Sequence, residues 1–376
     1  MEGKTEKEIF QSQGKRIIIA GGGTGGHIFP AIAIANALKQ QAPETDILFV
    51  GAMGKMEMEK VPQAGYRIIG LTIAGFNRKS LQKNILLPLK LIRSFWQVKK
   101  IFQDFSPDAV IGVGGYSSFP VLRFAQAKGI PSFIHESNSF AGKSNQLLGN
   151  KASAIFVASD GMEKFFPKEK LLKTGNPVRK NIAQSTLSRA EGIHFFGLNE
   201  QKKTILAVGG SLGAKSINDA LLLHIDAWEQ NDLQLIWQTG KTDAGLYQTA
   251  ARGKQNIWVG TFIEHMEMAY AAADIVISRA GAMAVTELCV AGKPAVFVPY
   301  PHAAEDHQTF NALSLVRQDA ALMVKDNEAK EKLLPTVIEL AGDEKRQMEL
   351  KQKIQSLAIS NADEVIAAEI LKKIHG

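Results

Sequence analysis

The stretch that decides the fold is RIIIAGGGTGGH, residues 16–27. Residues 16–20 form a short, β-branched apolar run closed by glycine, which is typical of a buried strand. Residues 21–26 predict a glycine loop, and residues 30–39 predict a helix with Pro30 in its first turn. A glycine loop between a strand and a helix brings a phosphate within reach of backbone N–H groups. One such loop is equally compatible with a tight turn that binds nothing.

The same arrangement begins again in the second half of the chain. Residues 204–208 predict a strand, residues 209–214 (GGSLGA) a glycine loop and residues 216–224 a helix. Further strands are expected at residues 47–50, 110–115, 132–135, 154–158, 233–238, 257–259, 275–278 and 295–298. Because strands alternate with helical stretches, we expect parallel sheets covered on both faces. The fold class is therefore α/β, with two Rossmann-like domains in tandem.

The chain has 376 residues, more than a single core usually supports. The turn-rich segment at 175–179 predicts the joint between the domains. We therefore expect one domain over residues 1–178 and a second over 179–355. A charged helical segment, 356–376, is expected to complete the first domain.

Composition excludes several classes of protein. The one cysteine, Cys289, permits no intrachain disulfide and no cysteine-based metal site, which favours a reducing cytoplasm. Its apolar neighbours predict a small buried side chain. The N-terminus lacks the apolar run of a secretion signal. Residues 17–38 carry no Asp, Glu, Lys or Arg, but their glycines and proline disfavour a membrane span.

The positive charge is local. The net charge is +7, yet residues 60–103 contain nine Lys and Arg and no acid, so the remainder carries 7 − 9 = −2. From Pro88 onward, apolar side chains recur at helical spacing. A basic segment without acidic residues favours binding to anionic lipid headgroups. An ordinary amphipathic helix packed on its domain is the simpler alternative. The expected membrane contacts are Leu86, Leu87, Lys90, Arg93, Phe95 and Trp96. No interleaved aromatic platform predicts nucleic-acid binding.

The segment SRAGAMAVTE, residues 278–287, is the sharpest feature. It follows a predicted strand, and its small residues leave the backbone accessible at a helix start. Glu287 lies where a carboxylate could accept hydrogen bonds from both ribose hydroxyls. The alternative is a capped helix with an exposed glutamate. The first glycine loop matches neither the dinucleotide fingerprint, since Gly51 replaces the expected acid, nor a Walker loop.

Several motifs together carry a resemblance. They occur in this order: residues 22–27 (GGTGGH), 114–116 (GGY), 135–138 (HESN), 175–179 (GNPVR), 209–214 (GGSLGA), 278–287 (SRAGAMAVTE), 299–302 (PYPH), 306–308 (DHQ) and 311–312 (NA). Through them the chain resembles the MurG family of peptidoglycan glycosyltransferases (glycosyltransferase family 28), which have the GT-B fold of two Rossmann-like domains facing a cleft. The motifs cover nearly all of residues 16–315.

The resemblance implies an inverting transfer of N-acetylglucosamine (GlcNAc) from UDP-GlcNAc to the muramyl 4-hydroxyl of lipid I, giving lipid II for the cell wall. The implied UDP-GlcNAc contacts are Thr24, Gly25, Gly26, Asn138, Arg179, Ser211, Ile263, Ala282, Met283, Ala284, Val285, Thr286, Glu287 and Gln308. Among them, Arg179 and Ser211 match phosphate contacts, Ile263 a uracil contact and Glu287 a ribose contact, whereas Asn138 and Gln308 match sugar contacts. The implied partners are the donor, lipid I, an anionic membrane surface and other cell-wall synthesis proteins, at the cytoplasmic face of the inner membrane.

The sequence contains no motif that would require a cofactor for this reaction. No Asp-x-Asp motif occurs, so we expect no divalent ion at such a motif. Arg179, Ser211 and a helix N-terminus could assist departure of UDP through positive potential. The acceptor hydroxyl needs a base. His27 is one candidate, with a purely structural role as its alternative, and Glu136 is the rival; His135 is expected to be structural.

Three other functions are compatible with the sequence. A UDP-GlcNAc 2-epimerase would share the architecture but gives no reason for the basic segment without acidic residues. Another lipid glycosyltransferase, for example one acting on diacylglycerol, would use the same donor. A non-catalytic nucleotide-binding subunit would be expected to lose cleft residues, yet His27, Asn138, Arg179, Ser211, Glu287 and Gln308 are all present.

Overall fold

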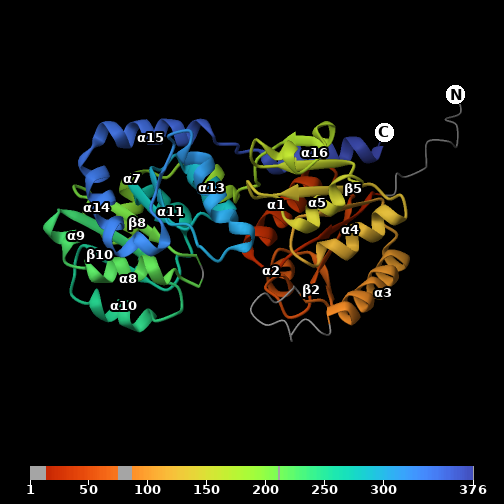
Figure 1. Ribbon diagram of the computed structural model, residues 1–376, viewed down its shortest axis with the longest axis horizontal. Coiled ribbons are helices and arrows are strands. Elements are labelled where there is room, and N and C mark those ends of the chain that lie inside the picture. Colours follow the sequence, from red (N-terminus) through yellow and green to blue (C-terminus); the bar gives the residue numbers. More distant parts are fainter. Residues whose placement is uncertain (1–13, 75–86, 211, 376) are drawn as a thin grey trace, which may run out of the picture.

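The computed structural model describes residues 14–74, 87–210 and 212–375. The chain forms two α/β domains side by side, each with a parallel sheet between layers of helices (Figure 1). The α/β class is therefore confirmed.

The first domain has seven described strands in the order β3-β2-β1-β4-β5-β6-β7. They are β1 (Arg16–Ala20), β2 (Asp46–Ala52), β3 (Arg67–Leu71), β4 (Ala109–Gly112), β5 (Ser132–Glu136), β6 (Ala154–Val157) and β7 (Leu171–Lys173). Its helices are α1 (Gly25–Gln41), α2 (Glu57–Gln63), α3 (Leu87–Phe105), α4 (Ser118–Ala127) and α5 (Lys143–Gly149). Alternate residues of β1 point to opposite faces: Ile18 packs in one apolar cluster, whereas Ile17 and Ile19 pack in another.

The second domain has six described strands in the order β10-β9-β8-β11-β12-β13. They are β8 (Lys203–Val208), β9 (Leu233–Gln238), β10 (Ile257–Gly260), β11 (Ile275–Ser278), β12 (Ala295–Phe297) and β13 (Leu322–Met323). Its helices are α6 (Lys180–Ala183), α7 (Arg189–Phe195), α8 (Lys215–Leu223), α9 (Ala227–Gln230), α10 (Ala244–Ala250), α11 (Met266–Ala272), α12 (Ala282–Ala291), α13 (His307–Val316), α14 (Ala329–Gly342) and α15 (Glu344–Ser356). In both domains the first strand in the sequence precedes a glycine loop, which places these loops at the carboxyl edge of the sheets.

The last helix, α16 (Ala362–His375), lies beside α1 in the first domain (Figure 1). Ile366 and Ile370 are fully buried in the same cluster as Ile34 and Leu38 of α1. The Gln41 side chain also donates to the backbone carbonyl of Glu364 at 2.9 Å. We therefore assign this helix to the first domain, with the chain crossing between domains near residue 178 and again after α15.

The start of α1 differs from the prediction. The helix begins at Gly25, so the glycine loop is shorter than expected and Pro30 lies inside the helix rather than in its first turn. The carbonyl of Thr24 accepts from the backbone N–H groups of His27 and Ile28, which starts the helix early. Pro30 removes one interior N–H donor, a local cost that the burial of Pro30 and Ile34 in the core offsets.

Loops from the two sheets meet between the domains. The backbone N–H of Ser139, after β5, donates to Asn311 Oδ1 of α13 at 2.9 Å. The rings of Phe140 and Phe310 stack with centroids 5.1 Å apart. The cleft predicted at this edge is thus closed by direct contacts at one point. Within the described residues, no helix is both long enough and apolar enough to cross a bilayer.

Candidate active site between the domains

The first glycine loop is packed backbone to backbone against the loop after β4. The N–H of Gly22 donates to the carbonyl of Gly114 at 3.3 Å. A Cβ at Gly115 would lie 2.4 Å from the carbonyl oxygen of Gly22, and Gly115 has a φ of 84°. Only glycine fits such a position, because both the space and the backbone conformation exclude a side chain. The two loops therefore form one closely packed unit at the edge of the sheet.

His27 is held by this unit. Its Nδ1 lies 3.1 Å from the carbonyl oxygen of Gly22 and 3.4 Å from Thr24 Oγ1. A carbonyl only accepts, so Nδ1 carries the proton and Nε2 carries the lone pair. Burial lowers the pKa of His27, against the opposing effects of the Gly22 carbonyl and Glu136. His27 is therefore a neutral imidazole near pH 7, with its lone pair on Nε2.

Glu136, the rival base, is buried and already satisfied. Its Oε1 accepts from the backbone N–H and the side-chain amide of Asn138, at 3.1 and 3.2 Å. Its Oε2 accepts from the N–H of Gly142 at 3.0 Å and from Asn145 Nδ2 at 2.8 Å. Four donors to one carboxylate favour a role in shaping the loop after β5 rather than proton transfer.

Asn138, a predicted sugar contact, is fixed from both domains. Its carbonyl oxygen Oδ1 accepts from Asn311 Nδ2 at 3.3 Å, and Asn311 Nδ2 also donates to the carbonyl of Ala280 at 3.1 Å. Asn311 is nearly fully buried. The side chain of Asn311 therefore ties the loop after β5 to the loop that precedes α12.

Arg179 and Glu287 were predicted to contact different parts of the donor, and they contact each other in the described structure. The guanidinium forms two hydrogen bonds to the Glu287 carboxylate, at 3.0 and 3.2 Å. Tyr270 Oη donates to the same carboxylate at 3.1 Å. Glu287 is 7% exposed, so the alternative of an exposed glutamate is wrong. The Arg179 guanidinium also lies 6.0 Å from the centroid of the Phe29 ring on α1, which places it at the junction of the domains.

The predicted donor contacts on α12 lie on different sides of the helix. Ala282, Val285 and Thr286 line an interdomain cavity, together with Cys289 one turn farther on. Glu287 lies on a different side of the helix, toward Arg179. The remaining two, Met283 and Ala284, are partly exposed at the helix start.

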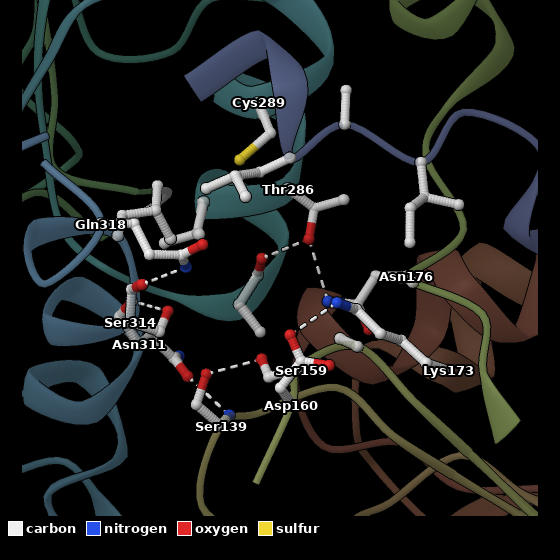
Figure 2. Close-up of a pocket in the computed structure, with 18 of the residues that line it drawn as sticks. Ser139, Ser159, Asp160, Lys173, Asn176, Thr286, Cys289, Asn311, Ser314 and Gln318 are labelled. Carbon is white, nitrogen blue, oxygen red and sulfur yellow. Dashed lines mark hydrogen bonds and ion pairs between the residues drawn. The ribbon is translucent and has the colours of Figure 1, made fainter. Parts of the chain in front are cut away.

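That cavity has a volume of about 540 Å³. Figure 2 shows hydroxyl and amide groups around it, with Asn176 donating to Thr286 Oγ1 at 2.9 Å and Ser139 paired with Ser159 at 2.7 Å. Lys173 and Asp160 close one side with an ion pair. The cavity extends the cleft toward the second chain crossing near residues 356–359.

The second glycine loop is only partly described, since Ser211 lies outside the described residues. Gly210 has a φ of 83°, and its carbonyl accepts from Gln238 Nε2 at 3.1 Å. Gln238 Oε1 accepts in turn from the N–H of Ile263 at 2.9 Å. Gln238 thus joins the loop to the predicted uracil contact, whose side chain is buried.

Gln308, the last predicted sugar contact, lies in the first turn of α13 and is partly exposed. Its Oε1 accepts from the N–H of Tyr300 at 3.0 Å. Thr24, Gly25 and Gly26 lie at the start of α1, as the corrected helix boundary requires. His135 is fully buried, and burial lowers its pKa to about 4.

Sequence reasoning missed three residues that organise the site. Glu57, nearly fully buried, accepts from the N–H of Gly23 at 2.9 Å. Tyr270 orients Glu287, and Asn311 links the domains. Only Asn311 had a signal in the sequence, since it belongs to a recognised motif. The other two act through contacts between distant segments.

The predicted membrane helix, α3, packs on its domain along part of its apolar surface. Val98, Ile101 and Phe102 are buried against the domain, whereas Ile92 and Trp96 are 57% and 67% exposed. The apolar side chains of the helix therefore form a packed stripe and an exposed stripe. Of the predicted contacts, Arg93 and Trp96 are exposed and Lys90 and Phe95 are partly buried. Leu86 and the side chain of Leu87 lie outside the described residues.

Comparisons with known proteins identify the family to which this chain belongs. Residues 17–157 match the model of the glycosyltransferase family 28 N-terminal domain, and residues 204–368 match that of its C-terminal domain. A relative from Bacteroides fragilis is 50% identical over 373 residues, covering 98% of both chains. This chain belongs to glycosyltransferase family 28. The enzyme is thus a glycosyltransferase with the GT-B fold, as the motifs predicted.

The relative from Bacteroides fragilis is named UDP-N-acetylglucosamine–N-acetylmuramyl-(pentapeptide) pyrophosphoryl-undecaprenol N-acetylglucosamine transferase. A relative with the same name from Parabacteroides distasonis is 49% identical over 362 residues, covering 96% of this chain and 98% of its own. Among solved structures, MurG of Acinetobacter baumannii matches with a TM-score of 0.78 at 30% identity, covering 95% of this chain and 99% of its own.

Proposed function

We propose that this glycosyltransferase moves GlcNAc from UDP-GlcNAc to the muramyl 4-hydroxyl of undecaprenyl-pyrophosphoryl-MurNAc-pentapeptide (lipid I), giving lipid II and UDP with inversion at the anomeric carbon. The observation that carries the proposal is the 50% identity, over almost the whole chain, to a relative named for this transfer. A site with a neutral histidine at the cleft supports it.

His27 is the base in this mechanism. Its Nε2 takes the proton of the 4-hydroxyl as the oxygen attacks the anomeric carbon of GlcNAc. The bond between that carbon and the UDP oxygen breaks, and both electrons leave with UDP. The geometry supports this role, since Nδ1 lies against the Gly22 carbonyl, which leaves the lone pair on Nε2. Glu136, with four donors on its carboxylate, keeps the loop after β5 in shape.

Departure of UDP needs positive potential at the diphosphate. Arg179 supplies a guanidinium beside the cleft, and the N-termini of α8 and α12 add the positive ends of two helix dipoles. In this proposal, Glu287 accepts hydrogen bonds from the ribose hydroxyls. Donor binding then requires the Arg179–Glu287 pair to rearrange, so that one partner contacts phosphate and the other contacts ribose.

The lipid acceptor requires the enzyme to work at a membrane surface. The exposed stripe of Ile92 and Trp96 lies on the helix that also carries Lys90, Arg93, Lys99 and Lys100. Lys99 Nζ lies 5.4 Å from the centroid of the Trp96 ring, so cationic and apolar groups are intermixed. This combination suits the anionic headgroup region of the cytoplasmic leaflet.

Acceptor dependence tests the proposal. Purified enzyme is incubated with UDP-GlcNAc, with or without a soluble lipid I analogue, and released UDP is measured. We expect UDP only when the analogue is present. Conversion of UDP-GlcNAc to an epimer without acceptor would instead identify an epimerase.

A further inference from the structure

A buried carboxylate lies directly beneath the first glycine loop. Glu57, the first residue of α2, is 1% exposed. Its Oε2 accepts from the N–H of Gly23 and its Oε1 from the N–H of Ala52, each at 2.9 Å. Glu57 therefore joins the end of β2 to the loop after β1 through two charge-assisted hydrogen bonds.

The Glu57 side chain occupies the space that a side chain would need at two glycines. A Cβ at Gly22 would lie 2.2 Å from Glu57 Oε1, and a Cβ at Gly51 would lie 2.5 Å from Glu57 Cγ. Any side chain at either position would push the carboxylate out. Gly51 stands where a dinucleotide site would have an acidic residue, and in this fold it leaves space for the Glu57 side chain.

The peptide between Gly22 and Gly23 links Glu57 to His27, the proposed base. The N–H of Gly23 and the carbonyl of Gly22 belong to the same peptide and point in opposite directions. Glu57 accepts from that N–H, and His27 Nδ1 lies 3.1 Å from that carbonyl oxygen. A negative charge on the N–H side polarises the peptide and makes its carbonyl a better acceptor.

We propose that Glu57 is a positioning residue for His27, acting through the Gly22–Gly23 peptide. It fixes the direction of the Gly22 carbonyl, which keeps the proton of His27 on Nδ1 and the lone pair on Nε2. This inference rests on the proposed function, in which Nε2 accepts the proton of the acceptor hydroxyl.

The position of Glu57 also revises the role of the loop. One of its N–H groups, that of Gly23, points inward to a carboxylate and is unavailable to a diphosphate. The part of the loop around Gly23 therefore serves to hold the histidine rather than to bind a ligand.

Other titratable groups also face His27. Glu136 at the end of β5 raises its pKa and does so more than Glu57, whereas His307 at the start of α13 lowers it. His135, adjacent in β5, is neutral near pH 7 because burial lowers its pKa to about 4. Removing the charge of Glu57 alone therefore shifts the pKa of His27 downward.

The test compares the full-length enzyme with Glu57→Gln, which keeps the side-chain shape but loses the charge and one acceptor. Turnover is measured against pH, together with the Kd for UDP. We expect kcat to fall at least tenfold, the Kd for UDP to change less than twofold, and the acid limb of the pH profile to move to lower pH. Glu59→Gln, an exposed neighbour on the same helix, is the matched control and should behave as wild type.

A Glu57→Gln enzyme with unchanged kcat and an unmoved acid limb would overturn the inference, while loss of turnover in His27→Ala would leave the proposed function standing. Wild-type turnover in His27→Ala would instead contradict the base itself. Should Glu57→Gln fail to fold, ¹⁵N NMR of the histidines in the wild-type enzyme decides. A proton on Nδ1 of His27 supports the inference, and a proton on Nε2 overturns it.

Discussion

Arg179 Nε lies 3.0 Å from Glu287 Oε1, so two predicted donor contacts, 108 residues apart in sequence, are paired with each other. The Arg179 side chain is 32% exposed and that of Glu287 is 10% exposed. Both are partly withdrawn from water, which strengthens the pair but leaves the guanidinium accessible from the cleft. The pair holds the cationic group at the domain junction before the donor arrives.

Replacing Glu287 by Gln should weaken donor binding. The amide keeps the shape but loses the charge-assisted contact to ribose, which is worth about 1.5–3 kcal/mol. We expect KM for UDP-GlcNAc to rise about 10- to 100-fold, with a smaller change in kcat. Steady-state kinetics and UDP titration calorimetry check this, with exposed Glu331→Gln as control. An unchanged KM would remove Glu287 from the donor site.

The pH dependence should follow His27. Burial lowers its pKa below the usual value of 6.5, so the base is unprotonated and active at neutral pH. Activity should fall as pH drops through that lowered pKa, giving an acid limb below pH 6.5. His27→Ala should reduce kcat by about 10²- to 10⁴-fold and abolish this limb, while exposed His194→Ala retains both. An acid limb that survives in His27→Ala would assign the titration to another group.

Asn311 should prove essential to the interdomain contact. In Asn311→Asp, a carboxylate oxygen would replace the Nδ2 that donates to Asn138 and Ala280, and would face two acceptors. Loss of these bonds costs about 1–3 kcal/mol, so kcat/KM should fall roughly 5- to 150-fold. Kinetics and thermal unfolding measure the effect, and exposed Asn231→Asp serves as control. Wild-type kcat/KM would show that the domains do not need this link.

Membrane binding should depend on the exposed stripe of α3. The double variant Ile92→Glu/Trp96→Glu removes two exposed apolar side chains and adds negative charge. We expect it to remain in the supernatant when sedimented with vesicles containing anionic lipid at low salt, whereas the wild type pellets. Leu246→Glu, at an exposed leucine of the second domain, is the matched control. Equal pelleting of all three proteins would contradict this contact surface.

Much of the fold could be predicted because buried parallel strands are short apolar runs bounded by glycine or turns. The predicted bounds of β1, β9 and β11 coincide with those of the structure. The strands that were missed, β3, β7 and β13, are partly exposed strands toward the sheet margins. β7 and β13 have only three and two residues, and four of the five residues of β3 are exposed or partly buried, so none of them forms the buried apolar run of a central strand.

The site was harder to predict than the fold because its contacts cross long sequence distances. The loop motifs located the cleft, but Glu57 meets Gly23 from 34 residues away, and no local pattern distinguishes it from its acidic neighbours. The early start of α1 was also missed. Gly25 and Gly26 disfavour helix locally, but the Thr24 carbonyl accepts from the N–H groups of His27 and Ile28, so both glycines lie in the first turn.

The product of the reaction tests the central claim most directly. Enzyme, UDP-GlcNAc and a lipid I analogue are incubated, and the lipid product is analysed by mass spectrometry and by proton NMR of the new glycosidic bond. The account predicts one added GlcNAc, joined in the inverted β configuration to the muramyl 4-oxygen. An α linkage, attachment at another position, or no glycosylated lipid would contradict it.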